Sequence, residues 1–298
     1  RHVTLDLPDR DARLAILKIH TQKKPMAEDV SLEQVARETT GFSGADLKNL
    51  LNEAAMLAAR EGSSSIRAND ISLMRDKVIL GTERELLIMP DEHRRIACHE
   101  AGHTVVAYFL TKADPILKVS IVPRGQSLGV TQQLPSEDRH NYSEDYLKDR
   151  LSILMGGRCA EKILLGSVSS GADDDIKQAS ALARSMVSRW GMSESVGALD
   201  LRDSTEHPFL GKEITQSRNH SEETCHQVDE AVKEFIVEAE QKASSIISAH
   251  RKVLDNLIQA LEEKETLNRE EIIRYLGAGP ETETDTLSKL EVPLHHPF

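Results

Sequence analysis

The sequence is poor in aromatic residues and cysteines. Aromatic residues make up 3% of its 298 residues, so its cores have to be built from Leu, Ile, Val and Ala, a composition that suits helices. Cys98, Cys159 and Cys225 are odd in number and far apart in the chain. They fit neither a disulfide framework nor a cysteine-type zinc site, and they are typical of a reducing compartment.

Long apolar runs, basic tracts and a phosphate-binding loop are also missing. No apolar run approaches the roughly 18 residues of a membrane span, and no signal peptide opens the chain. The 49 acidic and 37 basic residues give a net charge of −12, and we expect no nucleic-acid partner. Because no G-x-x-x-x-G-K-S/T sequence is present, this chain alone is not expected to hydrolyse ATP. The length suits two domains, and the absence of an initial Met indicates a piece of a longer protein.

The stretch His99-Glu100-Ala101-Gly102-His103 is the H-E-x-x-H motif of zinc proteases. It lies in a predicted helix over 91–110, where residues four apart share a face. His99 and His103 can then bind one metal ion, while Glu100 lies beside it and can take a proton from a metal-bound water. The alternative is a buried helix whose histidines bond to neighbouring groups. Gly102 costs a helix interior up to about 1 kcal/mol, which indicates a closely packed neighbour.

A catalytic zinc ion needs a third protein ligand and an open position for water. Asp173, Asp174 and Asp175 begin a predicted helix after a loop that contains Gly171, so each is a candidate ligand. Acidic residues are also ordinary capping and dipole choices at a helix start. The periodicity does not choose among the three aspartates and does not exclude Glu161.

The remaining patterns predict a mainly helical chain with one β region. Residues 1–8 read as the end of a strand, and four short helices follow, with predicted starts or caps at Asp9, Ser31, Ser43 and Ala68. Residues 116–135 alternate in hydrophobicity around a Pro-Arg-Gly turn and predict a hairpin or small sheet. Further helices are expected after Ser143, interrupted at Gly156-Gly157-Arg158, and then over 173–190, 221–250, 252–263 and up to Gly277. The apolar stripe of the 173–190 helix would run from Ile176 to Trp190, and residues 280–298 would be disordered.

Two sets of motifs carry family resemblances. Residues 1–9 with Gly41-Phe42-Ser43-Gly44-Ala45-Asp46-Leu47 resemble the AAA ATPase family, as the last strand of the ATPase core followed by the helical lid. The chain over about 1–278 is similar to the FtsH family of membrane-anchored, ATP-dependent zinc proteases. That likeness rests on the H-E-x-x-H motif and on four further segments, which are 118–125, 128–131, 156–161 and 171–176.

The resemblance implies a fold class and a domain order. The fold would be mainly α, with a AAA helical lid followed by a helical zincin-type peptidase domain that carries a small β-sheet or hairpin. Residues 1–8 would end the AAA ATPase core, 9–82 would form the lid, 83–278 the zinc peptidase domain and 279–298 a disordered tail.

The resemblance also implies roles for particular residues. His99, His103 and Asp175 would hold Zn²⁺, because the family's aspartate ligand directly precedes an Ile or Leu, and Glu100 would be the base. Leu128, Gly129, Val130 and Thr131 would bind the substrate peptide along a strand edge, and Gly44 and Ala45 would lie near the nucleotide of an intact ATPase. The sequence departs from the family's usual Tyr at Cys98 and from its frequent Asn at Asp174.

The function implied is that of a zinc metalloendopeptidase that degrades unfolded proteins, or membrane and cytosolic proteins. In the intact protein, ATP- and Mg²⁺-driven unfolding by a homo-hexamer would feed the peptidase, and a missing N-terminal anchor would hold the hexamer in the bacterial cytoplasmic membrane, or in a mitochondrial or plastid membrane. The rival hypothesis is a proteolytically inactive, ring-forming structural or adaptor subunit. A third hypothesis is a module that binds metal without hydrolysing peptides, in which Glu100 has no catalytic role.

Overall fold

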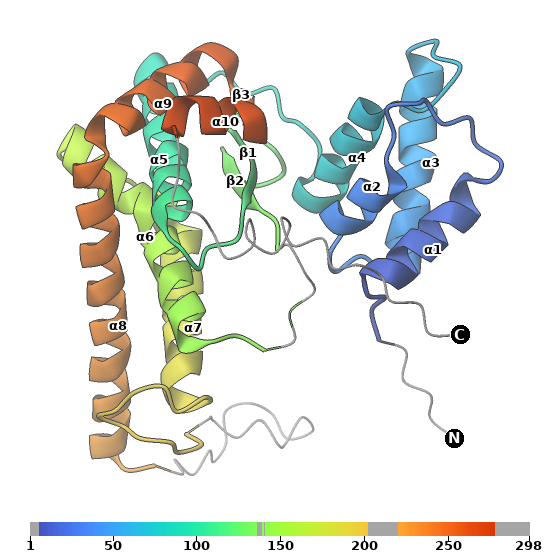
Figure 1. The fold of residues 1–298 in the computed structure, drawn as a ribbon. Helices are drawn as coiled ribbons and strands as arrows, with labels where there is room; N and C mark the ends of the chain where they lie inside the picture. Colours follow the sequence, from blue (N-terminus) through green and yellow to red (C-terminus); the bar gives the residue numbers. More distant parts are fainter. Residues whose placement is uncertain (1–5, 136–138, 140, 202–219, 278–298) are drawn as a thin grey trace, which may run out of the picture. The chain divides into compact units, whose positions relative to one another are not determined.

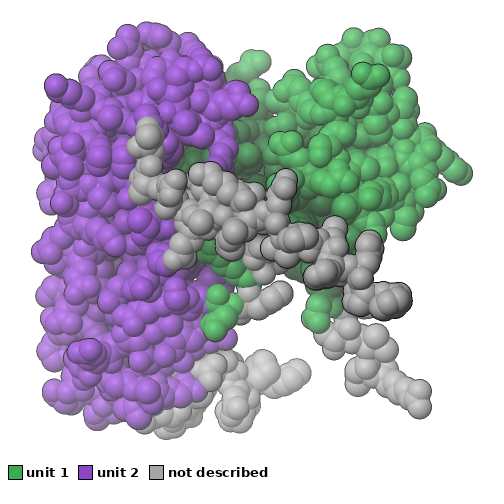
Figure 2. Space-filling model, in the orientation of Figure 1, with its two compact units in different colours: residues 1–89, 114–141 green, residues 90–113, 142–298 purple. Residues whose placement is uncertain are grey.

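The computed structural model describes residues 6–135, 139, 141–201 and 220–277. The chain forms two compact units, one made of residues 1–89 with 114–141 and the other of residues 90–113 with 142–298 (Figure 2). Helices dominate the described residues, and the strands are few and short. The predicted fold class, mainly α with a small sheet, is confirmed.

The first unit begins with four short helices, each of which starts close to its predicted position. They are α1 (Arg10–Thr21), α2 (Leu32–Glu38), α3 (Gly44–Arg60) and α4 (Ala68–Leu80). Asp9, Ser31 and Ser43 cap the first three by accepting hydrogen bonds from backbone N–H groups, which removes unsatisfied donors at the helix starts. Buried leucines fill the space between these helices, and Leu17, Leu47, Leu50 and Leu51 are fully inaccessible to solvent.

The predicted hairpin completes this unit. Strands β1 (Ile116–Ser120) and β2 (Val130–Gln133) pair antiparallel, with Val119 opposite Thr131. Lys118 on β1 forms an ion pair with the buried carboxylate of Asp76 on α4. A side chain on Gly125 would place its Cβ 2.5 Å from the carbonyl oxygen of Leu80, so the turn between the strands lies directly against the end of α4. The hairpin therefore packs as one body with the helices before residue 81.

The second unit is built around α5 (Pro90–Phe109) and α6 (Glu144–Leu165), which pack against each other (Figure 1). Helix α7 (Asp173–Ser188) follows a short 3₁₀ turn at Ser170–Ala172, and the long α8 (Glu222–Ala249) packs on both α6 and α7. Helix α9 (Arg251–Lys264) covers α5, and β3 (Thr266–Asn268) leads into α10 (Arg269–Leu276). Every residue of α5 from 96 to 107 is buried, so this helix lies at the centre of the unit.

Several expectations differ from the structure. Helix α6 runs without a break through Gly156-Gly157-Arg158, although an interruption was predicted there. Ile176 and Trp190 are exposed, and Trp190 lies beyond the end of α7, so the buried stripe of α7 consists of smaller residues such as Ala179 and Ala183. Residues 1–5 of the expected initial strand and the expected disordered tail lie outside the described residues, and residues 6–8 are not in a strand.

Candidate metal centre

Helix α5 brings two histidines to one point in the protein interior. His99 and His103 are each 8% exposed, and their Nε2 atoms lie 3.0 Å apart. The two glycines Gly102 and Gly156 allow α5 and α6 to touch at this level, because a Cβ on Gly102 would lie 2.5 Å from the Gly156 carbonyl oxygen. The closely packed neighbour predicted from Gly102 is therefore the backbone of α6.

Helix α7 adds a carboxylate to the pair. Asp175 Oδ2 lies 3.0 Å from His99 Nε2 and 3.3 Å from His103 Nε2. Asp173 and Asp174 are exposed on the same first turn, and Asp174 accepts a hydrogen bond from Gln178. The residue that precedes α7 as its N-cap is Ala172, so none of the three aspartates occupies the N-cap position. Among the three aspartates, Asp175 is the one that the structure brings to the histidines.

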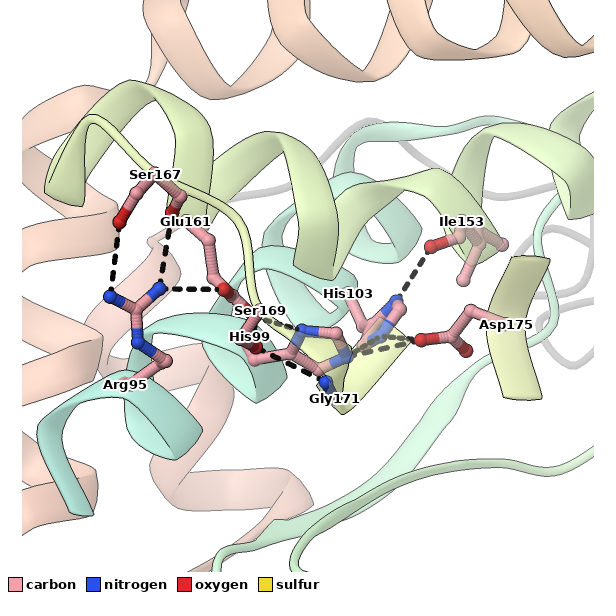
Figure 3. A network of polar contacts seen from close by, with 9 residues as sticks. All are labelled: Arg95, His99, His103, Ile153, Glu161, Ser167, Ser169, Gly171 and Asp175. Carbon is pink, nitrogen blue, oxygen red and sulfur yellow. Dashed lines mark hydrogen bonds and ion pairs between the residues drawn. The ribbon is translucent and has the colours of Figure 1, made fainter. Parts of the chain in front are cut away.

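Two acceptors behind the imidazole rings fix their orientation (Figure 3). His103 Nδ1 lies 2.7 Å from the carbonyl oxygen of Ile153, and His99 Nδ1 lies 2.9 Å from Oε1 of Glu161. A carbonyl and an ionised carboxylate only accept, so each Nδ1 carries the hydrogen. In their neutral forms both rings then present Nε2 lone pairs to the same point as the Asp175 carboxylate.

This donor set fits a zinc ion. Zinc bonds of about 2.0–2.1 Å in a tetrahedral arrangement place neighbouring ligand atoms about 3.3 Å apart. The three ligand atoms of His99, His103 and Asp175 are separated by 3.0, 3.0 and 3.3 Å. Gly157 borders the same point, where a Cβ would lie 2.6 Å from both Nε2 atoms. Among the described residues, this is the group of histidine, cysteine and acidic side chains arranged to hold a metal ion.

Comparison with known families agrees with this geometry. The sequence profile described as peptidase family M41 matches residues 86–275. The chain belongs to peptidase family M41. A second profile, described as an AAA+ lid domain, matches residues 29–73. The M41 match spans the whole donor set, and the lid match falls within the helices of the first unit.

Bacterial proteins of this family are closely similar in sequence. The chain is 57% identical over 279 residues to the ATP-dependent zinc metalloprotease FtsH of Hahella chejuensis, a match that covers 94% of this chain and 45% of the relative. It is 48% identical over 272 residues to the FtsH of Nitrosococcus oceani, covering 91% of this chain and 43% of that relative. The chain therefore spans less than half the length of these relatives. No helix within the described ranges has the length and apolar character that a membrane crossing requires.

The charges of the M41 site stabilise one another. Burial lowers the pKa of His99, but the hydrogen-bonded carboxylates of Asp175 and Glu161 outweigh this effect and raise it to about 10. Burial raises the pKa of Asp175, but its contacts with His103 and His99 hold that pKa well below its usual range. In the metal-free chain, His99 therefore carries a proton at neutral pH. A metal ion has to displace that proton to reach Nε2.

The other predicted site residues have different surroundings. Glu100 follows His99 on α5 and is 7% exposed. Leu128 and Gly129 precede β2, and Val130 and Thr131 begin it. All four are partly buried and belong to the unit that does not contain the histidines. In that same unit, Gly44 and Ala45 are the first two residues of α3.

Glu161 contacts Nδ1 of His99 and does not belong to the group of His99, His103 and Asp175 that could hold a metal ion. It lies one helical turn after Gly157 on the face of α6 that packs on α5, and this spacing was available in the sequence. Its contacts with Arg95 and Ser169 were not predicted, because the first depends on the packing of α5 on α6 and the second on the loop between α6 and α7.

Proposed function

We propose that this chain carries the zinc metalloendopeptidase activity of its family. The observation that supports this most directly is the convergence of three acceptor atoms on one buried point, with both histidine tautomers fixed from behind. In the metal-free chain the proton on His99 holds these atoms together, and a bound cation would take the place of that proton. His99, His103 and Asp175 are the proposed ligands, and the fourth position is left for water and substrate.

In this proposal, peptide hydrolysis depends on Glu100 as the base. Bound zinc would supply a Lewis acid for the scissile carbonyl and lower the pKa of the attacking water. Glu100 accepts the proton of that water and delivers it to the leaving amine.

Substrate binding is proposed at β2. Extended peptides bind to exposed strand edges by adding a strand. The proposed residues are Leu128 and Gly129, which lead into β2, and Val130 and Thr131, which begin it. Residues 9–82 are proposed as the AAA lid and 83–278 as the peptidase domain, with 1–8 as the end of the ATPase core. Gly44 and Ala45 are proposed to lie near a nucleotide in the intact protein.

The whole protein is proposed to be an ATP- and Mg²⁺-dependent homo-hexamer that unfolds protein substrates. Its proposed location is the bacterial cytoplasmic membrane, with the catalytic part facing the cytoplasm and an N-terminal anchor outside this chain. Relatives that carry the name ATP-dependent zinc metalloprotease support this reading. An inactive ring-forming adaptor is not favoured, because the family match and the complete set of His, Glu, His and Asp point to an enzyme.

The Glu100→Gln variant tests the role of the base. It should retain zinc, because Glu100 is not a proposed ligand, and it should lose cleavage of a flexible, unfolded peptide assayed without ATP. The matched control is Glu92→Gln, an exposed glutamate in the first turn of the same helix, which should keep both properties. Zinc content and peptide cleavage are measured on the same samples. Cleavage at the wild-type rate by the Glu100→Gln variant would disprove the assignment.

A further inference from the structure

The carboxylate of Glu161 is held by three donors, two of them on α5 and one in the loop between α6 and α7. Oε1 accepts from His99 Nδ1 at 2.9 Å and from Ser169 Oγ at 3.0 Å, while Oε2 accepts from Arg95 Nη1 at 2.8 Å (Figure 3). Glu161 is 1% exposed, so water does not replace these partners. The carboxylate is therefore fixed on both of its oxygens.

This fixation matters because a glutamate side chain does not orient its own carboxylate. The terminal torsion of glutamate is broad and has no sharp staggered minimum. Contacts with Arg95 and Ser169 therefore select the carboxylate plane, and that plane sets the direction in which His99 Nδ1–H can donate. This hydrogen bond sets the orientation of the His99 ring, and the orientation of the ring sets the direction of the Nε2 lone pair.

Arg95 is itself anchored at its outer end. Its Nη1 donates to the carbonyl oxygen of Ser167 at 3.1 Å, and its Nη2 donates to Ser167 Oγ at 3.2 Å. Arg95 lies four residues before His99, one turn earlier on the same face of α5. A planar guanidinium that bonds both the loop and Glu161 holds the carboxylate in one place, which a single flexible ammonium does less well.

Ser169 connects the same carboxylate to the start of α7. Its hydroxyl donates to Glu161 and accepts from the backbone N–H of Gly171 at 3.2 Å, so Ser169 caps the 3₁₀ turn over Ser170–Ala172. That turn runs directly into α7, whose third residue is Asp175. The Ser169 hydroxyl therefore links Glu161, which contacts His99 Nδ1, to the turn that positions Asp175, which contacts His99 Nε2.

We propose that Arg95 and Ser169 are positioning residues of the metal centre, which act through Glu161 to align His99 and the first turn of α7 for metal binding. This inference rests on the proposed function, in which His99, His103 and Asp175 hold zinc. Neither Arg95 nor Ser169 touches the metal position. Their effect is on the affinity and geometry of the site.

A purely structural role makes a different prediction. An ion pair that only stabilises the fold would change the melting temperature of the metal-free chain and leave the affinity of the folded chain for metal unchanged. A positioning role lowers that affinity and changes the coordination geometry even where the chain remains folded. Metal binding by the folded protein therefore separates the two roles.

The decisive variant is Arg95→Met in the 298-residue chain, with Arg94→Met as its matched control. Arg94 is the adjacent arginine, its side chain is 63% exposed, and its carboxylate partner is Glu262 at 3.6 Å. Zn²⁺ affinity is measured by competition with a chromogenic chelator, geometry by the visible spectrum of the Co²⁺-loaded chain, and folding by the melting temperature of the metal-free chain. Arg95→Met should bind Zn²⁺ about 10- to 100-fold more weakly and give an altered Co²⁺ spectrum, whereas Arg94→Met should match the wild type. Arg95→Lys should recover part of the loss.

Two further variants keep the test decisive. If Arg95 acts through Glu161, the double variant Arg95→Met/Glu161→Gln should bind Zn²⁺ no more weakly than Glu161→Gln alone. Ser169→Ala should also lower Zn²⁺ affinity. If Arg95→Met does not fold, the Zn²⁺ affinity of Ser169→Ala tests the inference in its place. A folded Arg95→Met variant with wild-type Zn²⁺ affinity and Co²⁺ spectrum would overturn the inference. A wild-type chain that binds no Zn²⁺ would instead overturn the proposed function.

Discussion

Replacing Gly157 by alanine should weaken metal binding while leaving the fold intact. The added Cβ would lie 2.6 Å from His99 Nε2, from His99 Cε1 and from His103 Nε2. Carbon and nitrogen atoms that are not bonded approach to about 3.5 Å at best, so either the imidazole rings swing aside or α6 shifts. Either movement takes the two Nε2 atoms away from the Asp175 carboxylate that they now contact.

The size of the effect follows from the cost of overpacking. Adding one carbon to a closely packed interior costs about 1–3 kcal/mol, and every 1.4 kcal/mol is a factor of ten in affinity. If the metal-bound state carries this cost, Zn²⁺ affinity should fall about 5- to 150-fold. The metal-free chain can relieve the contact by moving the rings, and it gains up to about 1 kcal/mol from replacing a helical glycine by alanine. Its stability should therefore change little.

Chelator competition measures the Zn²⁺ affinity, and urea unfolding of the metal-free chain measures its stability. Gly44→Ala is the control, because Gly44 is also helical and a Cβ there would lie in ordinary contact, 3.7 Å from Ile16 Cδ1. The control should bind Zn²⁺ like the wild type. Wild-type affinity in Gly157→Ala would refute the reasoning, since it would mean that the space beside the two Nε2 atoms is not needed by the metal.

Two further predictions concern the aspartates and the cysteines. Asp175→Asn should lower Zn²⁺ affinity at least about tenfold, whereas Asp173→Asn, at an exposed position, should leave it unchanged. A zinc titration of both variants measures this. Weaker binding by Asp173→Asn than by Asp175→Asn would reject Asp175 as a ligand. Iodoacetamide at about pH 8 should modify the exposed Cys225 and spare Cys98, because the thiolate is the reacting form and burial raises the pKa of Cys98 to about 12. The raised pKa stabilises the folded chain below the ordinary thiol pKa, and this contribution is lost as the pH rises towards 12. From pH 9 to pH 11, the free energy of unfolding should therefore fall more in the wild type than in Cys98→Ala; equal slopes and rapid labelling of Cys98 would contradict the prediction.

The sequence predicted the helices well because their ends carry local signals. Capping side chains such as Asp9, Ser31 and Ser143 act within a few residues, so they can be recognised without knowledge of the fold. The continuity of α6 through Gly156-Gly157 could not be recognised in this way. Glycine weakens an isolated helix, and only the close contact with α5 offsets that cost.

The candidate site was predicted where its residues are close in sequence. His99, Glu100 and His103 form one motif, and their relative positions follow from helix geometry alone. The residue patterns alone left Glu161 open beside the three aspartates, and only the family resemblance favoured Asp175. In the structure both carboxylates lie near His99 and differ in which ring nitrogen they face. The exposed Ile176 shows that the apolar stripe of α7 was predicted to begin too early in the helix.

The division of the chain into units has a consequence for how the protein can be cut. The backbone passes between the two units after residues 89, 113 and 141, so the hairpin lies in the middle of the stretch matched by the M41 profile yet packs with the helices that precede it. A truncated protein that starts near residue 83 would lose α4, and with it the partner of Lys118 and the surface against which Gly125 packs. The metal ligands would remain complete in such a protein. The hairpin that carries the proposed substrate strand would lose these two contacts, so loss of cleavage on truncation would not by itself implicate the metal.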